Sequence, residues 1–72
     1  MSDFICEEFG TRVRQLRLER ELTQEDLAAM TSLDRTYISS VERGKRNISL
    51  KNIKRIADAF DISISELLMG IG

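Results

Sequence analysis

The sequence predicts a single all-α domain of five helices, residues 1–72, with a helix-turn-helix unit at residues 23–42. Three observations support this prediction. The chain has 72 residues, the length of one small domain. It contains no proline, and its apolar residues recur three and four positions apart, as on one face of a helix. Two short helical patterns in residues 23–42 are separated by only a few polar residues, which is typical of a helix-turn-helix.

The first helix is expected from about Asp3 to Arg20. One face of it carries apolar residues spaced four, four and three apart, namely Ile5, Phe9, Val13 and Leu16. Gly10 lies inside this helix and weakens it by about 1 kcal/mol relative to alanine. We therefore expect its first turns to be loosely held.

The helix-turn-helix begins at Thr23, an N-cap residue followed three positions later by Asp26, which completes a capping-box pattern. The second helix is expected at about Gln24 to Met30. The residues predicted to face inward are Leu27, Ala28 and Met30. Two helices joined by such a short turn can place the second one in the DNA major groove. Sequence-specific DNA binding is therefore the working hypothesis.

The third helix is expected from about Arg35 to Arg43, with Asp34 as its N-cap and with Ile38 and Val41 on its inner side. Gly44 follows at once, as a glycine in the left-handed conformation does at the end of a helix.

The last two helices each begin after a serine. Ser49 is the expected N-cap of a helix from about Leu50 to Phe60, whose buried face is predicted to hold Leu50, Ile53, Ile56, Ala57 and Phe60. Ser63 and Glu66 form a second capping-box pattern, and Gly70 ends the fifth helix. The inward residues there are Ile64, Leu67 and Leu68.

Charge is unevenly distributed, although the formal net charge is only −1. Residues 35–55 hold seven basic residues and one acidic residue, a net charge of +6, whereas residues 1–34 carry −4 and residues 56–72 carry −3. One basic segment in an acidic chain is typical of a protein with one DNA-facing side. A solvated charged surface is the alternative interpretation.

Several classes are disfavoured by composition. The chain has no histidine and a single cysteine, Cys6, so we expect no zinc site, no internal disulfide, no cofactor and no small-molecule ligand. Cys6 is interpreted as a packing residue or surface thiol. An enzyme is not expected, because no paired acids or activated nucleophile can be recognised. The absence of a signal sequence and of a run of about 18 apolar residues favours a cytoplasmic protein.

The residues from Val13 to Leu68 resemble the helix-turn-helix family of phage Cro and repressor proteins. The runs that carry this resemblance are LTQEDLAAM, LDRTYISSVERGKRN and IADAFDISISELL. Within the family, DRTYIS followed by ERGKRN is similar to the controller proteins of restriction–modification systems. The resemblance implies a lambda-repressor-like fold and a homodimer that binds a palindromic operator on double-stranded DNA, activating and repressing its own operon.

The resemblance also implies roles for single residues. Gln24 matches a glutamine that donates to a DNA phosphate, and Ala28 a small residue where two helices pack closely. Arg17 and Glu42 match an ion pair that joins the first helix to the end of the third; two surface residues are the alternative. Ser32 departs from the pattern, which often has glycine there, and a left-handed serine costs about 1 kcal/mol.

Base-reading candidates lie on the outer side of the third helix, away from its apolar residues; they are Arg35, Thr36, Tyr37, Ser39 and Ser40. Arginine can donate two hydrogen bonds to guanine, which makes Arg35 the expected main reader. Tyr37 instead packs against the second helix or the loop after the third in the alternative interpretation.

Phosphate contacts are expected from the residues after the third helix, namely Arg43, Lys45, Arg46 and Asn47. Arg46 alternatively enters a narrow minor groove. Whether Lys51, Lys54 and Arg55 touch DNA stays open at this stage.

A dimer interface is expected in the C-terminal segment, residues 60–72, which has more apolar residues than one buried face requires. Its candidate residues are Phe60, Ile64, Leu68, Met69 and Ile71; a frayed terminus is the alternative. Glu25 matches a position where a phage repressor presents an activating acid, so it is a candidate contact for the sigma subunit of RNA polymerase. A phage-type repressor, an antitoxin regulator and a protein-interaction module without DNA binding are the competing functions.

Overall fold

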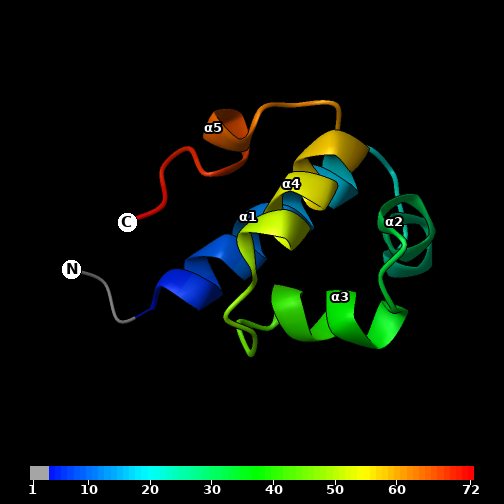
Figure 1. Ribbon diagram of the computed structural model, residues 1–72, viewed down its shortest axis with the longest axis horizontal. Helices are drawn as coiled ribbons and strands as arrows, with labels where there is room; N and C mark the ends of the chain where they lie inside the picture. Colours follow the sequence, from blue (N-terminus) through cyan, green and yellow to red (C-terminus); the bar gives the residue numbers. More distant parts are fainter. Residues whose placement is uncertain (1–3) are drawn as a thin grey trace.

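The computed structural model describes residues 4–72 and shows five helices within them, with no strand (Figure 1). The helices are α1 (Ile5–Glu19), α2 (Gln24–Thr31), α3 (Arg35–Glu42), α4 (Leu50–Ala59) and α5 (Ile64–Leu67). Helix α3 packs against α1 and α2, α2 also packs against α4, and α5 packs against α4. The predicted all-α fold with a helix-turn-helix is confirmed. None of the helices among these residues is both long enough and apolar enough to cross a membrane.

The boundaries of α2, α3 and α4 and the end of α1 agree with the predicted ones to within one residue, whereas α5 ends at Leu67, earlier than the predicted end at Gly70. Helix α2 extends one residue further than expected, and α1, α3 and α4 end one residue earlier. The predicted start at Asp3 lies outside the described residues. The starts of α2 and α4 and the end of α3 were predictable because the N-caps Thr23 and Ser49 and the glycine Gly44 are local sequence signals.

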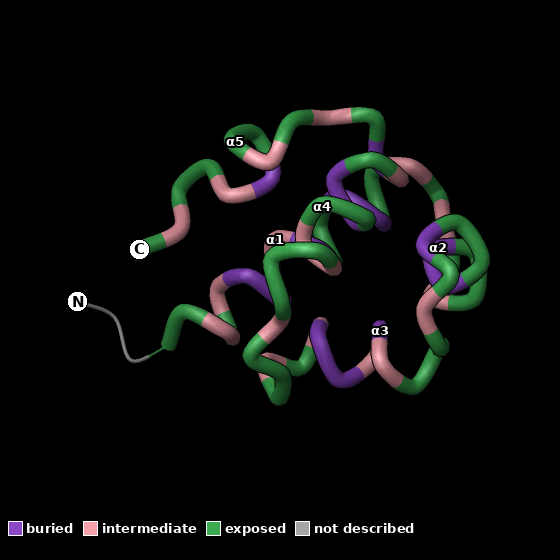
Figure 2. Tube along the Cα trace, viewed as in Figure 1, coloured by how far each residue is buried: buried purple, intermediate pink, exposed green. Residues whose placement is uncertain are grey.

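The core is formed by residues from all five helices, and Figure 2 shows buried and exposed positions alternating along them. Its members are Phe9, Val13, Leu16, Leu27, Ala28, Ile38, Val41, Ile56, Ala57, Phe60 and Leu67. Three residues predicted to be buried are exposed: Ile5, Met30 and Leu50, the last of which is 71% exposed. Ile5 and Leu50 are the first residues of their helices, and Met30 lies outside the buried positions of α2.

Three of the four predicted N-caps make the capping hydrogen bond that their sequence predicts. At α2 the hydroxyl of Thr23 accepts from the Asp26 amide at 3.0 Å, and the Thr23 amide donates to the Asp26 carboxylate at 2.8 Å. These bonds hold the pKa of Asp26 below its usual value. Ser49 and Ser63 cap α4 and α5 through their hydroxyls. Asp34 occupies the N-cap position of α3, but its side chain makes no capping hydrogen bond.

The segments after α1, α2, α3 and α4 each use a left-handed residue, and only one of these four residues is glycine. Glu21, Ser32 and Asp61 have φ of 55°, 59° and 56°, and Gly44 has φ of 72°. In each segment the next amide donates back to a carbonyl five residues earlier, as from Leu33 to Ala28. Residues with a Cβ cost about 1 kcal/mol in this conformation. The cost anticipated for Ser32 therefore applies at three positions.

Ser32→Gly is expected to raise the free energy of unfolding by about 1 kcal/mol, because glycine adopts the left-handed conformation without strain. Urea unfolding followed by circular dichroism measures this. Ala29→Gly is the matched control in the same helix, since Ala29 is exposed and helical, and it should lower stability by about 1 kcal/mol. A destabilised Ser32→Gly protein would show that the serine side chain has a stabilising role that outweighs the strain.

Gly10 lies where α1 comes closest to α3. It is buried, and a Cβ built on it would overlap the carbonyl oxygen of Val41 and lie 2.7 Å from the carbonyl oxygen of Glu42. No side chain fits between these backbones. The glycine that local propensity marks as a weak point is the residue that allows α1 to support the end of α3.

Candidate DNA-binding surface

The candidate surface is built on α3, whose inner side packs against the core and whose outer side faces solvent. Ile38 and Val41 are almost completely buried on its inner side. Arg35 and Thr36 are exposed on its first turn, and Ser39 is half-buried one turn later. Arg35 and Thr36 therefore present polar side chains outward from a rigid helix, which is what contact with base edges in a groove requires.

Ser40 is not on this outer surface, and we remove it from the candidate base readers. It is only 8% exposed. Its hydroxyl donates to the carbonyl oxygen of Tyr37 at 2.8 Å and accepts from Nε of Arg46 at 3.0 Å. The loop after α3 folds back over Ser40, so the residue positions Arg46.

Tyr37 is half-buried between the loop and α4. Its hydroxyl accepts from Nδ2 of Asn52 at 3.1 Å, and the guanidinium carbon of Arg46 lies 5.0 Å from the centre of its ring. That distance fits a cation–π contact. The alternative interpretation of Tyr37, packing against a neighbouring segment, agrees with this position. Asn52 was missed because nothing in its sequence context marks it.

The loop after α3 presents a basic edge. Arg43, Lys45, Arg46 and Asn47 are all exposed. Nε of Arg43 donates to the carbonyl oxygen of Ser39 at 3.3 Å. The loop turns at Gly44, where a Cβ would lie 2.7 Å from Cα of Glu7, so a left-handed glycine also allows close contact with α1. The four side chains are thus held beside the C-terminal end of α3.

Gln24, at the start of α2, also lies beside the C-terminal end of α3, and its amide is part of a partly buried network. Nε2 of Gln24 donates to Oε1 of Glu42 at 3.2 Å. Glu42 also accepts two bonds from Arg17, from Nε at 2.7 Å and from Nη2 at 2.9 Å. The ion pair joining α1 to the end of α3 is present, with side chains 9% and 3% exposed. These bonds raise the pKa of Arg17.

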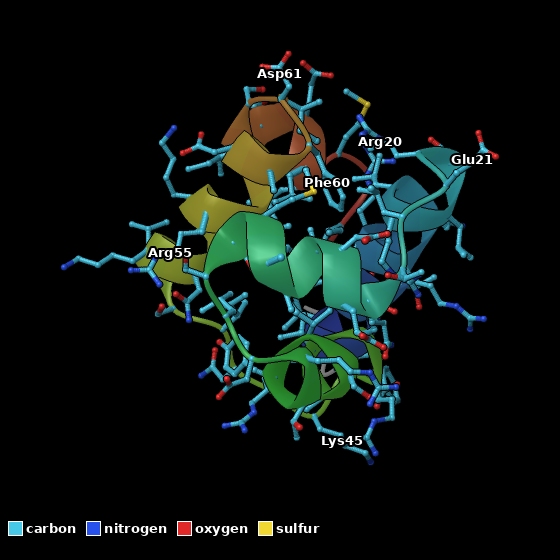
Figure 3. All side chains as sticks on the ribbon, turned by 90° about the vertical axis from the view of Figure 1, so that its right-hand side faces the viewer. Arg20, Glu21, Lys45, Arg55, Phe60 and Asp61 are labelled. Atoms are coloured by element: carbon cyan, nitrogen blue, oxygen red, sulfur yellow. The ribbon has the colours of Figure 1, made fainter. Side chains whose placement is uncertain are left out.

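Basic side chains gather near the end of the molecule where α3 lies. Figure 3 shows Lys45 at the end where α3 lies, Glu21 and Asp61 at the opposite end, and Arg55 on the side. Lys51, Lys54 and Arg55 are exposed on α4, and Lys54 is paired with Asp58 of the same helix. An anion is therefore attracted to the α3 end.

The C-terminal segment is only partly available for contacts with another molecule. Met69 is 65% exposed. The half-buried members Ile64, Leu68 and Ile71 pack against the core. Phe60, a predicted interface residue, is 3% exposed and lies in the core beneath Arg20, whose guanidinium carbon is 5.0 Å from its ring. Phe60 is therefore a core residue and not an interface residue. Ile5 joins Leu68 and Ile71 in lining an apolar groove.

An outward-facing helix held by a tight turn, with basic side chains beside it, defines a helix-turn-helix DNA-binding protein. The model of a family described as helix-turn-helix matches residues 13–67. The chain belongs to this family of DNA-binding transcriptional regulators, within which restriction–modification controller proteins are its close relatives. Such proteins are regulators and not enzymes.

Two relatives and two solved structures illustrate the similarity. Control protein C.MunI of Mycoplasma is 48% identical over 64 residues, covering 88% of this chain and 86% of that protein. Control protein C.BamHI of Bacillus amyloliquefaciens is 49% identical over 61 residues, covering 83% and 75%. The structure of the restriction-modification controller protein C.AhdI from Aeromonas hydrophila has a TM-score of 0.84 and 50% identity, covering 86% and 94%. The C.Esp1396I controller tetramer bound to its natural 35 base-pair operator has a TM-score of 0.84 and 36% identity, covering 93% and 88%.

Proposed function

We propose that this protein is the controller of a restriction–modification system, which binds a palindromic operator as a homodimer and both activates and represses its own operon. The observation that carries the proposal is the open outer face of α3, with Gln24 and the basic loop 43–47 both beside its C-terminal end. Because Gln24 and this loop come from segments before and after the outer face of α3 in the chain and meet beside its C-terminal end, phosphate contacts from both would fix that end of the helix in the major groove. In this proposal the protein works in the cytoplasm.

The proposed base readers are Arg35, Thr36 and Ser39, with Arg35 directed at guanine. The proposed phosphate contacts are Gln24, Arg43, Lys45, Arg46 and Asn47. Tyr37 supports Arg46 from beneath and contributes to DNA contact through that side chain. This division separates residues that select a sequence from residues that strengthen binding to any sequence.

Arg35→Ala and Lys45→Ala are expected to weaken operator binding in different ways. Loss of a bidentate guanine contact should cost about 1–3 kcal/mol of discrimination at one base pair. Loss of Lys45 should leave the sequence preference unchanged and reduce the slope of log K against log salt by about 0.9. Fluorescence anisotropy on the operator, on single-base variants and at several salt concentrations measures both. The assignment fails if Arg35→Ala weakens all sequences equally.

A homodimer is proposed because one copy is too small to select a site in a genome. The longest dimension of the chain is 33 Å, which equals about ten base pairs at 3.4 Å each. The exposed Met69 and the groove lined by Leu68 and Ile71 support an interface in the C-terminal segment. Hydroxyl-radical footprinting on the DNA upstream of the gene should show two symmetric half-sites about one helical turn apart. A single unsymmetric site would contradict the dimer.

Glu25 is proposed to touch the sigma subunit of RNA polymerase during activation. The side chain is exposed at the start of α2, beside Gln24, so polymerase bound next to the operator could reach it. Glu25→Lys is expected to retain operator binding and to lose transcriptional activation in a reporter assay. Asp34→Asn, which removes an exposed acid from the α2–α3 turn, is the control and should keep activation. Full activation by Glu25→Lys would exclude this contact.

A phage-type repressor is the second candidate function. The immunity repressor of Bacillus phage phi105 is 37% identical over 59 residues, but the match covers only 41% of that protein. The control proteins match over most of their length, which favours the controller. Neighbouring genes for an endonuclease and a methyltransferase would decide between the two.

A further inference from the structure

Three side chains from three helices meet where α1, α2 and α3 converge. Arg17 of α1 donates two hydrogen bonds to Glu42 at the end of α3, and Gln24 at the start of α2 donates a third at 3.2 Å. Nη1 of Arg17 also donates to the carbonyl oxygen of Leu22 at 2.8 Å, in the segment that leads into α2. The Glu42 carboxylate is therefore fixed relative to the residue that begins α2.

The carboxylate determines which way the Gln24 amide faces. An ionised carboxylate only accepts hydrogen bonds, so the amide nitrogen of Gln24 must point toward Glu42 and its oxygen must point elsewhere. The nitrogen has two hydrogens, and one remains after the bond to Glu42. If the amide turned over, its oxygen would face both Glu42 and any phosphate at this position. Two acceptors cannot form a hydrogen bond with each other.

We propose that the Arg17–Glu42 pair acts in DNA binding as well as in folding, with Glu42 as a positioning residue that orients the Gln24 amide toward a DNA phosphate. This inference rests on the phosphate contact proposed above for Gln24. In the free protein the pair holds the donor in the binding orientation. The Gln24 amide therefore loses less conformational freedom when DNA binds, and operator affinity is higher for that reason.

A double-mutant cycle on operator affinity tests the proposal. Arg17→Met/Glu42→Met removes the pair and replaces it with apolar side chains of similar length, a change that folded proteins often tolerate. Gln24→Ala is made in the wild type and in this background. Because a hydrogen bond to a charged group is lost, we expect Gln24→Ala to weaken the wild type about tenfold. We expect the paired substitution alone to weaken operator binding to a similar extent. In the background of the paired substitution, Gln24→Ala should weaken operator binding by less than about twofold further.

Two controls separate positioning from general destabilisation. Arg20→Met removes the arginine that covers Phe60 at the end opposite Lys45 (Figure 3), so it should lower stability without changing operator affinity. The salt slope should equal that of the wild type in Gln24→Ala and in the paired variant, because the first removes no charge and the second removes one of each sign. If the paired variant does not fold, Glu42→Gln with Arg17 retained takes its place. An amide can accept or donate toward Gln24, so the same loss of coupling is expected.

Each outcome has a separate meaning. If Gln24→Ala weakens binding equally in both backgrounds, the contact with phosphate stands and the positioning role of Glu42 is wrong. If Gln24→Ala has no effect in the wild type, the proposed phosphate contact itself is wrong, and the positioning role falls with it. A paired variant that binds the operator as tightly as the wild type also overturns the inference.

Discussion

Gly10→Ala is expected to destabilise the protein by about 3 kcal/mol or more, which is a large part of the stability of so small a domain. The added methyl would overlap backbone carbonyls of α3, 2.7 Å from the oxygen of Glu42. Backbone cannot move aside as a flexible side chain can, so α1 and α3 must separate. Separation would displace the end of α3 and with it the basic loop.

Urea unfolding measures the loss, and Gly70→Ala is the matched control. Gly70 has φ of 81° and no atom within 4 Å of an added Cβ. Its substitution therefore introduces backbone strain without a clash and should cost about 1 kcal/mol. Operator affinity of the folded Gly10→Ala protein, measured at low urea, should also fall. Stability within 1 kcal/mol of the wild type would mean that the two helices can separate at little cost.

The fold could be predicted where its determinants are local in sequence. Thr23 with Asp26, Ser49 and Gly44 mark helix ends through bonds or backbone angles within a few residues, and the structure confirms them. Met30 and Leu50 were wrongly predicted to be buried, although both follow a helical repeat. Burial depends on which side of a helix its neighbours cover, and helical spacing alone does not contain that information.

Gly10 shows the limit of propensity as an argument. Helix propensity gives the energetic cost of a glycine in an isolated helix. The structure shows that Gly10 also allows α1 to pack closely against the backbone of α3. A signal was available: Gly10 lies three residues before Val13 and seven before Arg17, on the buried face of α1. A glycine on an otherwise buried helical face indicates close backbone approach.

The outer face of α3 was predictable because Arg35 and Thr36 lie away from Ile38 on a helix. Ser40 was misassigned because its burial is not a property of the helix. The loop after Gly44 turns back, and Arg46 donates to the serine hydroxyl from six residues later. Phe60 was predicted both for the buried face of the fourth helix and for the dimer interface, and its burial confirms only the first prediction. The contact from Arg46 to Ser40 leaves no periodic signal in the sequence.

Glu42→Met alone is expected to destabilise the protein by about 3–5 kcal/mol, whereas Arg17→Met/Glu42→Met should recover most of that loss. The single change leaves the Arg17 guanidinium buried without its partner. The side chain is 9% exposed, and its hydrogen bond to the Glu42 carboxylate raises the pKa of Arg17 above an already high value. Arginine does not lose its proton in proteins, so the stranded charge cannot be relieved by deprotonation.

Thermal and urea unfolding of the two single variants and the double variant measure this difference. If the double variant is as unstable as Glu42→Met, the loss comes from packing at the helix junction and not from an unpaired charge. The same proteins serve for operator binding, so stability and affinity can be compared directly. Suppose the double variant has near wild-type stability but binds the operator about tenfold more weakly. The ion pair would then contribute mainly to DNA binding, because the protein would fold equally well without the pair.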